Sequence, residues 1–169
     1  MKNLNEFILE NIIDERQAHF ASYHSTAKHL SGEEFVRLYE KNSIDDLFKK
    51  TCPKEEYDDI KERGEIKDFE EESQMIEITD QAIIDDITNS KRFGPGQKTN
   101  FVLSSSYNAD ILFILKKKKL IDQETSKLLR NRGSISGIYT SDSLYIITYT
   151  GISSVIKSWM TSVIDETKQ

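Results

Sequence analysis

A chain of 169 residues with a formal net charge of −6 is long enough for one domain with a sizeable core. Its composition, 37% hydrophobic and 31% charged, excludes a disordered chain, and no apolar run approaches the roughly 20 residues that span a bilayer. The single cysteine, Cys52, excludes an intramolecular disulfide and is typical of a reducing compartment. We therefore expect a globular protein without a membrane partner.

Charge is distributed unevenly along the chain. Residues 1–90 carry 23 Asp and Glu against 11 Lys and Arg, whereas residues 91–169 carry 6 against 12. Any electrostatic partner should therefore meet two different surfaces, one acidic and one basic.

Helical signals begin the chain. Apolar residues recur at helical spacing from Leu4 to Phe20, with charged residues between them. Ser31 and Glu34 have the spacing of a capping box, which predicts the start of a helix that continues through Tyr39.

Further helix starts follow in the acidic half. Ser43 indicates a second helix, and Pro53 suits the first position of a third. Thr79 or Asp80 is expected to cap a helix that runs through Ile87. This half is therefore predicted to be mostly helical.

The segment 89–99 contains two glycines and a proline and is the clearest loop in the chain. After it, residues 101–105 are predicted to form a strand. The apolar run 109–115 has the composition of a helix or a strand, and Asn108 as a cap together with the lysines at its far end favours a helix.

The last third of the chain mixes both kinds of element. Asp122 opens a predicted short helix, residues 134–149 predict a β-hairpin, and apolar residues at 155–164 follow the spacing of an amphipathic helix. The expected class is α+β, a mostly helical N-terminal part followed by a small sheet or β-hairpin and a C-terminal amphipathic helix.

No catalytic constellation stands out. In the loop around Gly96, Gln97 separates the glycine from Lys98, which departs from the direct succession that a phosphate-binding loop requires. The three histidines are spaced five apart, so on a helix they point in different directions and cannot share one metal ion: His19, His24 and His29. We expect no enzyme, no cofactor and no metal.

Residues 55–72 contain ten carboxylates and three basic residues. They form either a solvated helix face or a surface that imitates a phosphate backbone and occupies a nucleic-acid-binding partner. The candidate binding residues are Glu55, Glu56, Asp58, Asp59 and Glu62.

A basic cluster lies in the second half of the chain. It could contact nucleic acid through phosphates, although no aromatic residue interleaves with it, and pairing with the acidic half explains it equally well. The candidate residues are Lys116, Lys117, Lys118, Lys119, Arg130 and Arg132.

The first ten residues contain the one motif of this sequence that matches a known sequence pattern. Met1, Lys2, Glu6, Phe7, Ile8 and Glu10 match the pattern Met-Lys-x-x-x-Glu-Phe-Ile-x-Glu. This decamer resembles the capsid-targeting sequence of the internal head proteins of T-even-type bacteriophages. The tripeptide Leu/Ile-x-Glu within it is not specific, because it recurs at Leu4–Glu6, Ile13–Glu15, Leu38–Glu40, Ile60–Glu62 and Ile164–Glu166.

The resemblance implies a processed virion protein. Residues 1–10, Phe7 among them, would be a propeptide that directs the chain to the prohead core. The prohead maturation protease would recognise Ile8 and Glu10 and cut before Asn11. Members of this family tend to be basic and travel with the packaged DNA, whereas this chain is acidic overall. That departure argues against simple association with DNA and leaves nucleic acid open as a partner.

The expected organisation is then a propeptide at 1–10, an acidic helical region at 11–88, a loop at 89–99 and a basic α+β region at 100–169 that shares one domain with 11–88. The expected location is the phage head interior and then the host cytoplasm, where inhibition of a host defence protein follows by analogy. The alternatives are a prohead core or scaffold component and a cytoplasmic protein–protein interaction domain.

Overall fold

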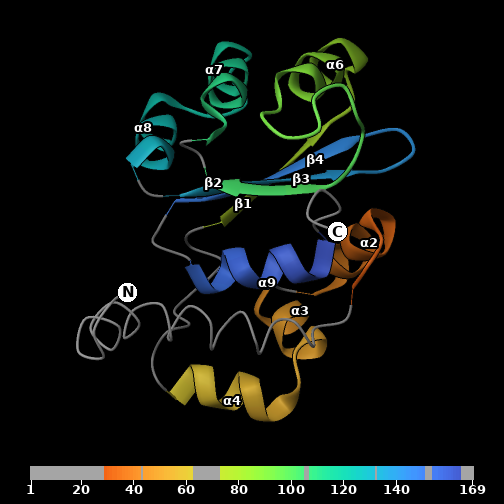
Figure 1. Ribbon diagram of the computed structural model, residues 1–169, viewed down its shortest axis with the longest axis vertical. Coiled ribbons are helices and arrows are strands. Elements are labelled where there is room, and N and C mark those ends of the chain that lie inside the picture. The colour runs from red at the N-terminus through yellow and green to blue at the C-terminus, as the bar shows by residue number, and fades with distance from the viewer. Residues whose placement is uncertain are drawn as a thin grey trace, which may run out of the picture.

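The computed structural model describes residues 29–42, 44–62, 73–104, 107–131, 133–150 and 154–164. Within them, helices come first and are followed by a mixture of strands and helices (Figure 1). In chain order the elements are α2 (Gly32–Lys41), α3 (Ile44–Thr51), α4 (Lys54–Glu62), β1 (Ser73–Ile78), α6 (Gln81–Ser90), β2 (Phe101–Ser104), α7 (Ala109–Lys117), α8 (Gln123–Asn131), β3 (Ser134–Tyr139), β4 (Leu144–Tyr149) and α9 (Ser154–Ile164).

The described strands form one antiparallel sheet in the order β1-β4-β3-β2. Strands β3 and β4 make the predicted hairpin, and the Thr140 N–H donates to the Ser143 carbonyl at 2.9 Å across its turn. Strand β1 pairs with β4, whereas β2 pairs with β3, so β1 and β2 are the two edges. The sheet therefore joins a strand of the acidic half to three strands of the basic half.

Helices cover both faces of this sheet. Figure 1 shows α6, α7 and α8 above the sheet, α9 and α2 below it, and α3 and α4 in a further layer. Because successive strand residues point to opposite faces, β3 directs Ile135 toward α6–α8 and Ile138 toward the α2–α9 side. Because both faces are covered, β3 and β4 are buried along almost their whole length; β4 is mostly apolar, whereas β3 also buries Ser134 and Ser136.

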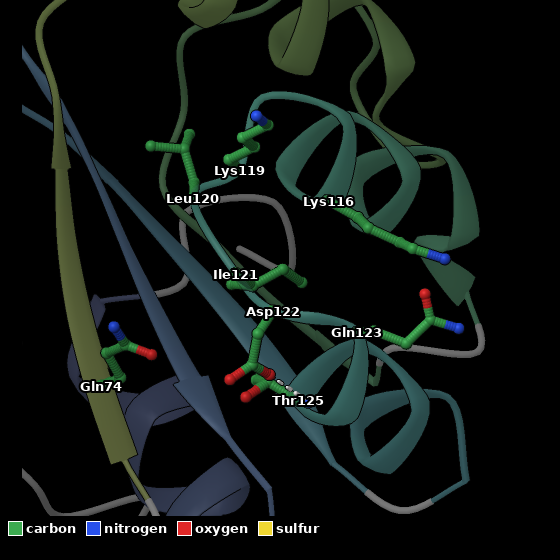
Figure 2. Close-up of a pocket in the computed structure, with 8 residues that line it drawn as sticks. All are labelled: Gln74, Lys116, Lys119, Leu120, Ile121, Asp122, Gln123 and Thr125. Carbon is green, nitrogen blue, oxygen red and sulfur yellow. Dashed lines mark hydrogen bonds between the residues drawn. The ribbon is translucent and has the colours of Figure 1, made fainter.

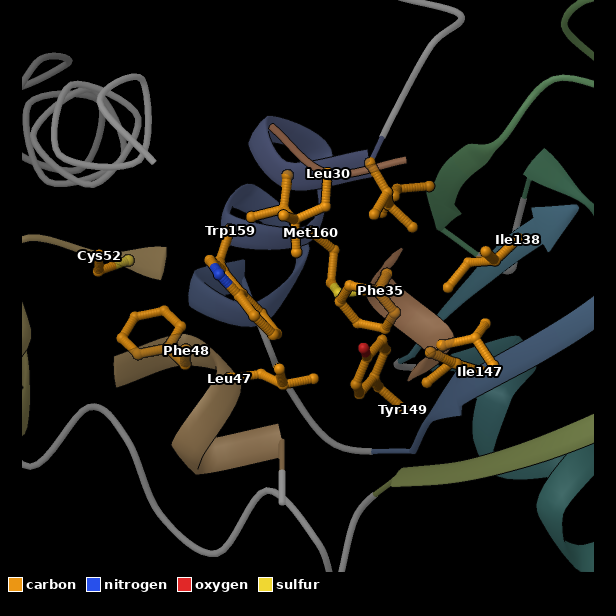
Figure 3. Packing of buried hydrophobic residues seen from close by; sticks show 14 of the residues in the cluster. Leu30, Phe35, Leu47, Phe48, Cys52, Ile138, Ile147, Tyr149, Trp159 and Met160 are labelled. Atoms are coloured by element: carbon orange, nitrogen blue, oxygen red, sulfur yellow. The ribbon is translucent and has the colours of Figure 1, made fainter. Parts of the chain in front are cut away.

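Trp159 of α9 lies at the centre of the lower core (Figure 3). Its ring centroid is 5.2 Å from that of Phe48 and 6.2 Å from that of Phe35, so three helices meet at one indole. The indole N–H donates to Thr51 Oγ1 at 2.6 Å. Burying large side chains of this kind stabilises the fold by about 1.5–3 kcal/mol each.

The upper core is aliphatic. Its members come from one side of each of α6, α7 and α8 and from the facing side of the sheet, and include Ile84, Ile87, Ile111, Leu112, Leu115, Leu129, Phe101, Ile135 and Ile146. The lysines at the end of α7 stay outside this core because the apolar run ends at Leu115.

The structure confirms the α+β class and several predicted helix starts. Ser31 caps α2, accepting from the Glu34 N–H at 3.2 Å. Asp80 caps α6 by accepting from the Ala82 N–H at 2.9 Å. These caps are local signals that a sequence carries in full, since both partners lie within three residues.

The predicted loop lies between α6 and β2. Gly94 and Gly96 adopt φ values of 62° and 81°, a left-handed conformation that side chains with a Cβ rarely tolerate. The two glycines therefore allow the chain to turn back within a few residues after α6.

Three expectations differ from the structure. Strand β1 lies in the region predicted to be mostly helical. Pro53 precedes α4 rather than occupying its first position. Asn108 stands at the N-cap of α7, but its side chain makes no capping hydrogen bond. The helix expected from 4 to 20 lies outside the described residues.

Candidate binding surfaces

The acidic candidate residues lie on α4, the helix farthest from the sheet in Figure 1. Tyr57 anchors this helix, since it is buried and its ring centroid is 5.6 Å from that of Phe48. The charged side chains occupy the rest of the helix: Glu55, Asp58 and Glu62 are exposed, Asp59 is half-buried, and Glu56 belongs to the same helix. The buried ring of Tyr57 thus attaches a largely acidic helix to the outer surface of the protein.

The basic candidate residues lie in the opposite outer layer. Lys116 and Lys117 end α7, Lys118 and Lys119 form the turn after it, and Arg130 belongs to α8; all five are exposed. Arg132 lies outside the described residues, as do Phe7, Ile8, Glu10 and Asn11.

The sheet keeps these two surfaces apart. The α9 layer and the sheet lie between α4 and α7, and each layer is about 10 Å thick. The Debye length in 0.1 M salt is also about 10 Å, so the charges on α4 interact only weakly with those at the end of α7. The lysine run is therefore too far from α4 to pair with its carboxylates. Pairing with the rest of the acidic half, part of which lies outside the described residues, stays a prediction.

Lys119 has the backbone conformation that a glycine normally supplies. Its φ is 58°, and it is the one non-glycine residue with a positive φ in the described part of the chain. The Leu120 N–H donates to the Leu115 carbonyl and the Lys119 N–H donates to the Lys116 carbonyl, which is the Schellman pattern with Lys119 at C′. A lysine held in this conformation costs about 1–2 kcal/mol of backbone strain.

A cleft of about 470 Å³ opens beside this turn (Figure 2). Asp122 is already engaged in it, because it accepts from the Thr125 N–H at 2.6 Å and so caps α8, and this hydrogen bond lowers the pKa of its carboxyl. The other polar side chains around the cleft are Gln74 of β1, Lys116, Lys119 and Gln123. The cleft is therefore open and mainly cationic.

A second cleft, of about 540 Å³, lies between the end of α6 and the start of α7. Arg92 and Tyr107 both line it and lie against each other, with the guanidinium carbon 5.0 Å from the ring centroid. Tyr107 is 50% exposed, and Asn108 beside it is almost completely buried. We call this space the α6–α7 cleft.

Lys91 fixes the loop that carries Arg92. Its side chain is buried, and its ammonium donates to the carbonyls of Gln97 and Thr99. The same nitrogen lies 5.3 Å from the ring centroid of Phe101 and 5.4 Å from that of Tyr139. Carbonyls and two aromatic faces replace the water that a lysine loses on burial.

The α6–α7 cleft was missed from the sequence. Arg92 lies in a segment that looks like an ordinary surface loop, and Tyr107 and Asn108 are far from it along the chain. The signal that could have found it is the pairing of a capping residue with an exposed aromatic just before a helix. No aromatic residue interleaves with the basic cluster, but exposed Phe113 precedes Lys116 and Lys117 by about one turn of α7 and so adjoins it.

No family model, curated protein or solved structure matched this chain. None of the helices in the described ranges has the length and apolar character needed to cross a membrane. In the same ranges, no group of three or more His, Cys, Asp and Glu side chains is placed to hold a metal ion.

Proposed function

We propose that this protein is a bacteriophage internal head protein that is carried into the prohead by residues 1–10, cut after Glu10 and delivered to the host with the genome. The observation that supports this proposal best is the agreement of six positions with the capsid-targeting decamer. The two oppositely charged outer layers support a protein that acts by binding once it is released.

Competing cleavage sites support selective trimming. A protease binds an extended segment, so a site within a packed helix must first unfold. The triplet at Leu38–Glu40 lies inside α2, Ile60–Glu62 ends α4, and Ile164 is buried at the end of α9. Cleavage after Glu40 would therefore require the end of α2 to unfold, whereas the bonds after Glu62 and Glu166 involve residues outside the described ranges.

Mass spectrometry of purified virions tests the proposal. We expect the packaged protein to begin at Asn11 and to contain 159 of the 169 residues. Glu10→Gln should leave the precursor uncut, whereas the matched variant Glu40→Gln in α2 should be trimmed normally. A protein that is absent from virions, or present with Met1 intact, would contradict the proposal.

Deletion of the gene distinguishes an internal protein from a prohead scaffold component. We expect heads to assemble in normal numbers on a permissive host, because the proposed activity is exerted after injection. Failure of head assembly would instead assign the chain to the scaffold.

A further inference from the structure

One side of α7 is exposed along the whole helix and carries an aromatic ring among charged side chains. Its exposed residues are Ala109, Asp110, Phe113, Lys116 and Lys117. At 3.6 residues per turn these positions lie in a single stripe. Phe113 is 59% exposed, more than any other large hydrophobic side chain in the described ranges. The core therefore makes little use of this ring, and a partner can reach it.

Basic side chains extend the stripe beyond the end of the helix. Lys118 and Lys119 are exposed in the turn after α7. Lys127 and Arg130 are exposed on α8, which packs beside α7 (Figure 1). None of these four side chains, nor the two lysines of the stripe, forms an ion pair with a carboxylate of the described residues. We call these six basic residues together with Phe113 the α7–α8 face.

Three carboxylates border the α7–α8 face. Asp110 lies at the start of the stripe, Glu124 is exposed in the first turn of α8, and Asp122 caps α8. They repel an anion and so direct it toward the lysine end of α7. The net charge of −6 also repels a polyanion from the molecule as a whole. Attraction of a polyanion therefore has to come from a local group of cations such as this face.

The combination of lysines with an exposed ring indicates the chemistry of the partner. Lysine ammonium groups attract phosphates, and an aromatic ring stacks on the face of a base. A single strand can offer both groups at once, because its bases are free to turn outward. A duplex keeps its bases stacked inside, and an acidic peptide satisfies the lysines but leaves Phe113 without a planar partner.

We propose that the α7–α8 face binds single-stranded nucleic acid. The ring of Phe113 stacks on one base, and Lys116 and Lys117, about one turn further along α7, hold the neighbouring phosphates. Figure 2 shows Lys116 and Gln123 on the same side of the cleft, where the Gln123 amide can hydrogen-bond to the edge of a second base. These contacts use bases and phosphates, which DNA and RNA share. The site does not depend on the packaging proposal.

The test is fluorescence anisotropy of a labelled oligothymidylate of about 15 nucleotides, titrated with the full chain at several salt concentrations. We expect the logarithm of the binding constant to fall with the logarithm of the salt concentration with a slope of about −3. Four lysines at 116–119 each neutralise one phosphate, and each phosphate of a single strand contributes about −0.7. Unlabelled oligothymidylate and oligouridylate should both displace the probe.

Phe113 provides the variants that separate stacking from charge. Phe113→Ala should weaken binding by about fivefold to a hundredfold and leave the salt slope unchanged, because it removes a stacked ring and no phosphate contact. Phe113→Tyr should retain binding, since it keeps the ring. The matched control is Phe93→Ala, because Phe93 is 48% exposed in the loop after α6, away from the lysine run. It should change binding by less than about twofold.

The lysines are tested through the salt dependence. Lys116→Gln combined with Lys117→Gln should weaken binding at low salt and reduce the magnitude of the slope by about 1–2. Lys41→Gln combined with Lys54→Gln removes the same charge from exposed positions of the lower helices and should leave the slope unchanged.

Three results would overturn the proposal. The labelled strand could fail to bind at low salt, or Phe113→Ala could weaken binding no more than Phe93→Ala. Displacement of the probe by duplex DNA or polyglutamate as effectively as by the unlabelled single strand would show general attraction of polyanions rather than a site for single-stranded nucleic acid.

Discussion

Thr51 shows how one hydroxyl group can join two distant parts of the chain. Its Oγ1 accepts from the Trp159 indole at 2.6 Å and donates to the Leu47 carbonyl at 2.8 Å, all within the lower core. The bond connects α3 to α9 across 108 positions of sequence. The hydroxyl therefore satisfies the one polar atom of the largest side chain in this core.

We expect Thr51→Val to lower the free energy of unfolding by about 1–3 kcal/mol, because it leaves a buried indole N–H without an acceptor. Chemical denaturation followed by tryptophan fluorescence would measure the change. The control is Thr161→Val, since Thr161 Oγ1 makes the same kind of bond to its own helix, to the Lys157 carbonyl at 2.7 Å, without an indole partner. An equal loss in both variants would contradict the role of the Trp159 bond.

The surroundings of Arg92 and Asn108 are also visible only residue by residue in the structure. Each is unremarkable in the sequence, and each acquires a role only from what lies beside it. An arginine in a polar loop is ordinary, whereas Arg92 packs against the ring of Tyr107, and Asn108 is buried at the start of α7 without capping it.

At the scale of elements, helix α7 ends in a turn whose left-handed backbone conformation is unfavourable for the lysine that occupies it. The Schellman turn places its C′ residue in the left-handed region, where glycine is favoured, and this chain has Lys119 there. Lys119 therefore carries backbone strain, and its ammonium group lies at the rim of the cleft in Figure 2.

Lys119→Gly should therefore raise the free energy of unfolding by about 1 kcal/mol, because glycine adopts this conformation without a Cβ clash. The neighbouring variant Lys118→Gly is the control, since Lys118 has an ordinary φ of −85° and glycine there only adds freedom to the unfolded chain. Thermal unfolding would separate the two. A gain in both variants, or a loss in both, would rule out strain at Lys119.

Most elements could be predicted from the sequence because their signals are local. Ser31, Asp80 and Asp122 each cap a helix through a partner two or three residues away, and the hairpin is marked by its own turn. Strand β1 could not be predicted in the same way. It follows an acidic run that indicates a helix, and it is stabilised by β4, which lies far along the chain.

At the scale of the whole molecule, the fold converts a charge division along the sequence into two separate surfaces. The acidic helix α4 and the basic ends of α7 and α8 lie in opposite outer layers. A chain of net charge −6 thus still presents a cationic face.

This separation predicts that the protein binds a cation-exchange resin at low salt despite its net charge. Lys116→Gln combined with Lys117→Gln should shift elution to lower salt. Lys41→Gln combined with Lys54→Gln removes the same charge from exposed positions of the lower helices and should leave elution unchanged. Equal shifts would mean that net charge, rather than a basic face, controls retention.

The sequence by itself determined the helix starts with local caps, the glycine loop, the hairpin, the α+β class and the two charged segments. Each of these depends on residues that are neighbours in the chain. Only the tertiary structure decided that β1 completes the sheet, that α4 and the end of α7 lie in opposite outer layers, and that Arg92 packs against Tyr107 beside the start of α7. These outcomes depend on which distant segments pack together, and that is set by burying both faces of one sheet.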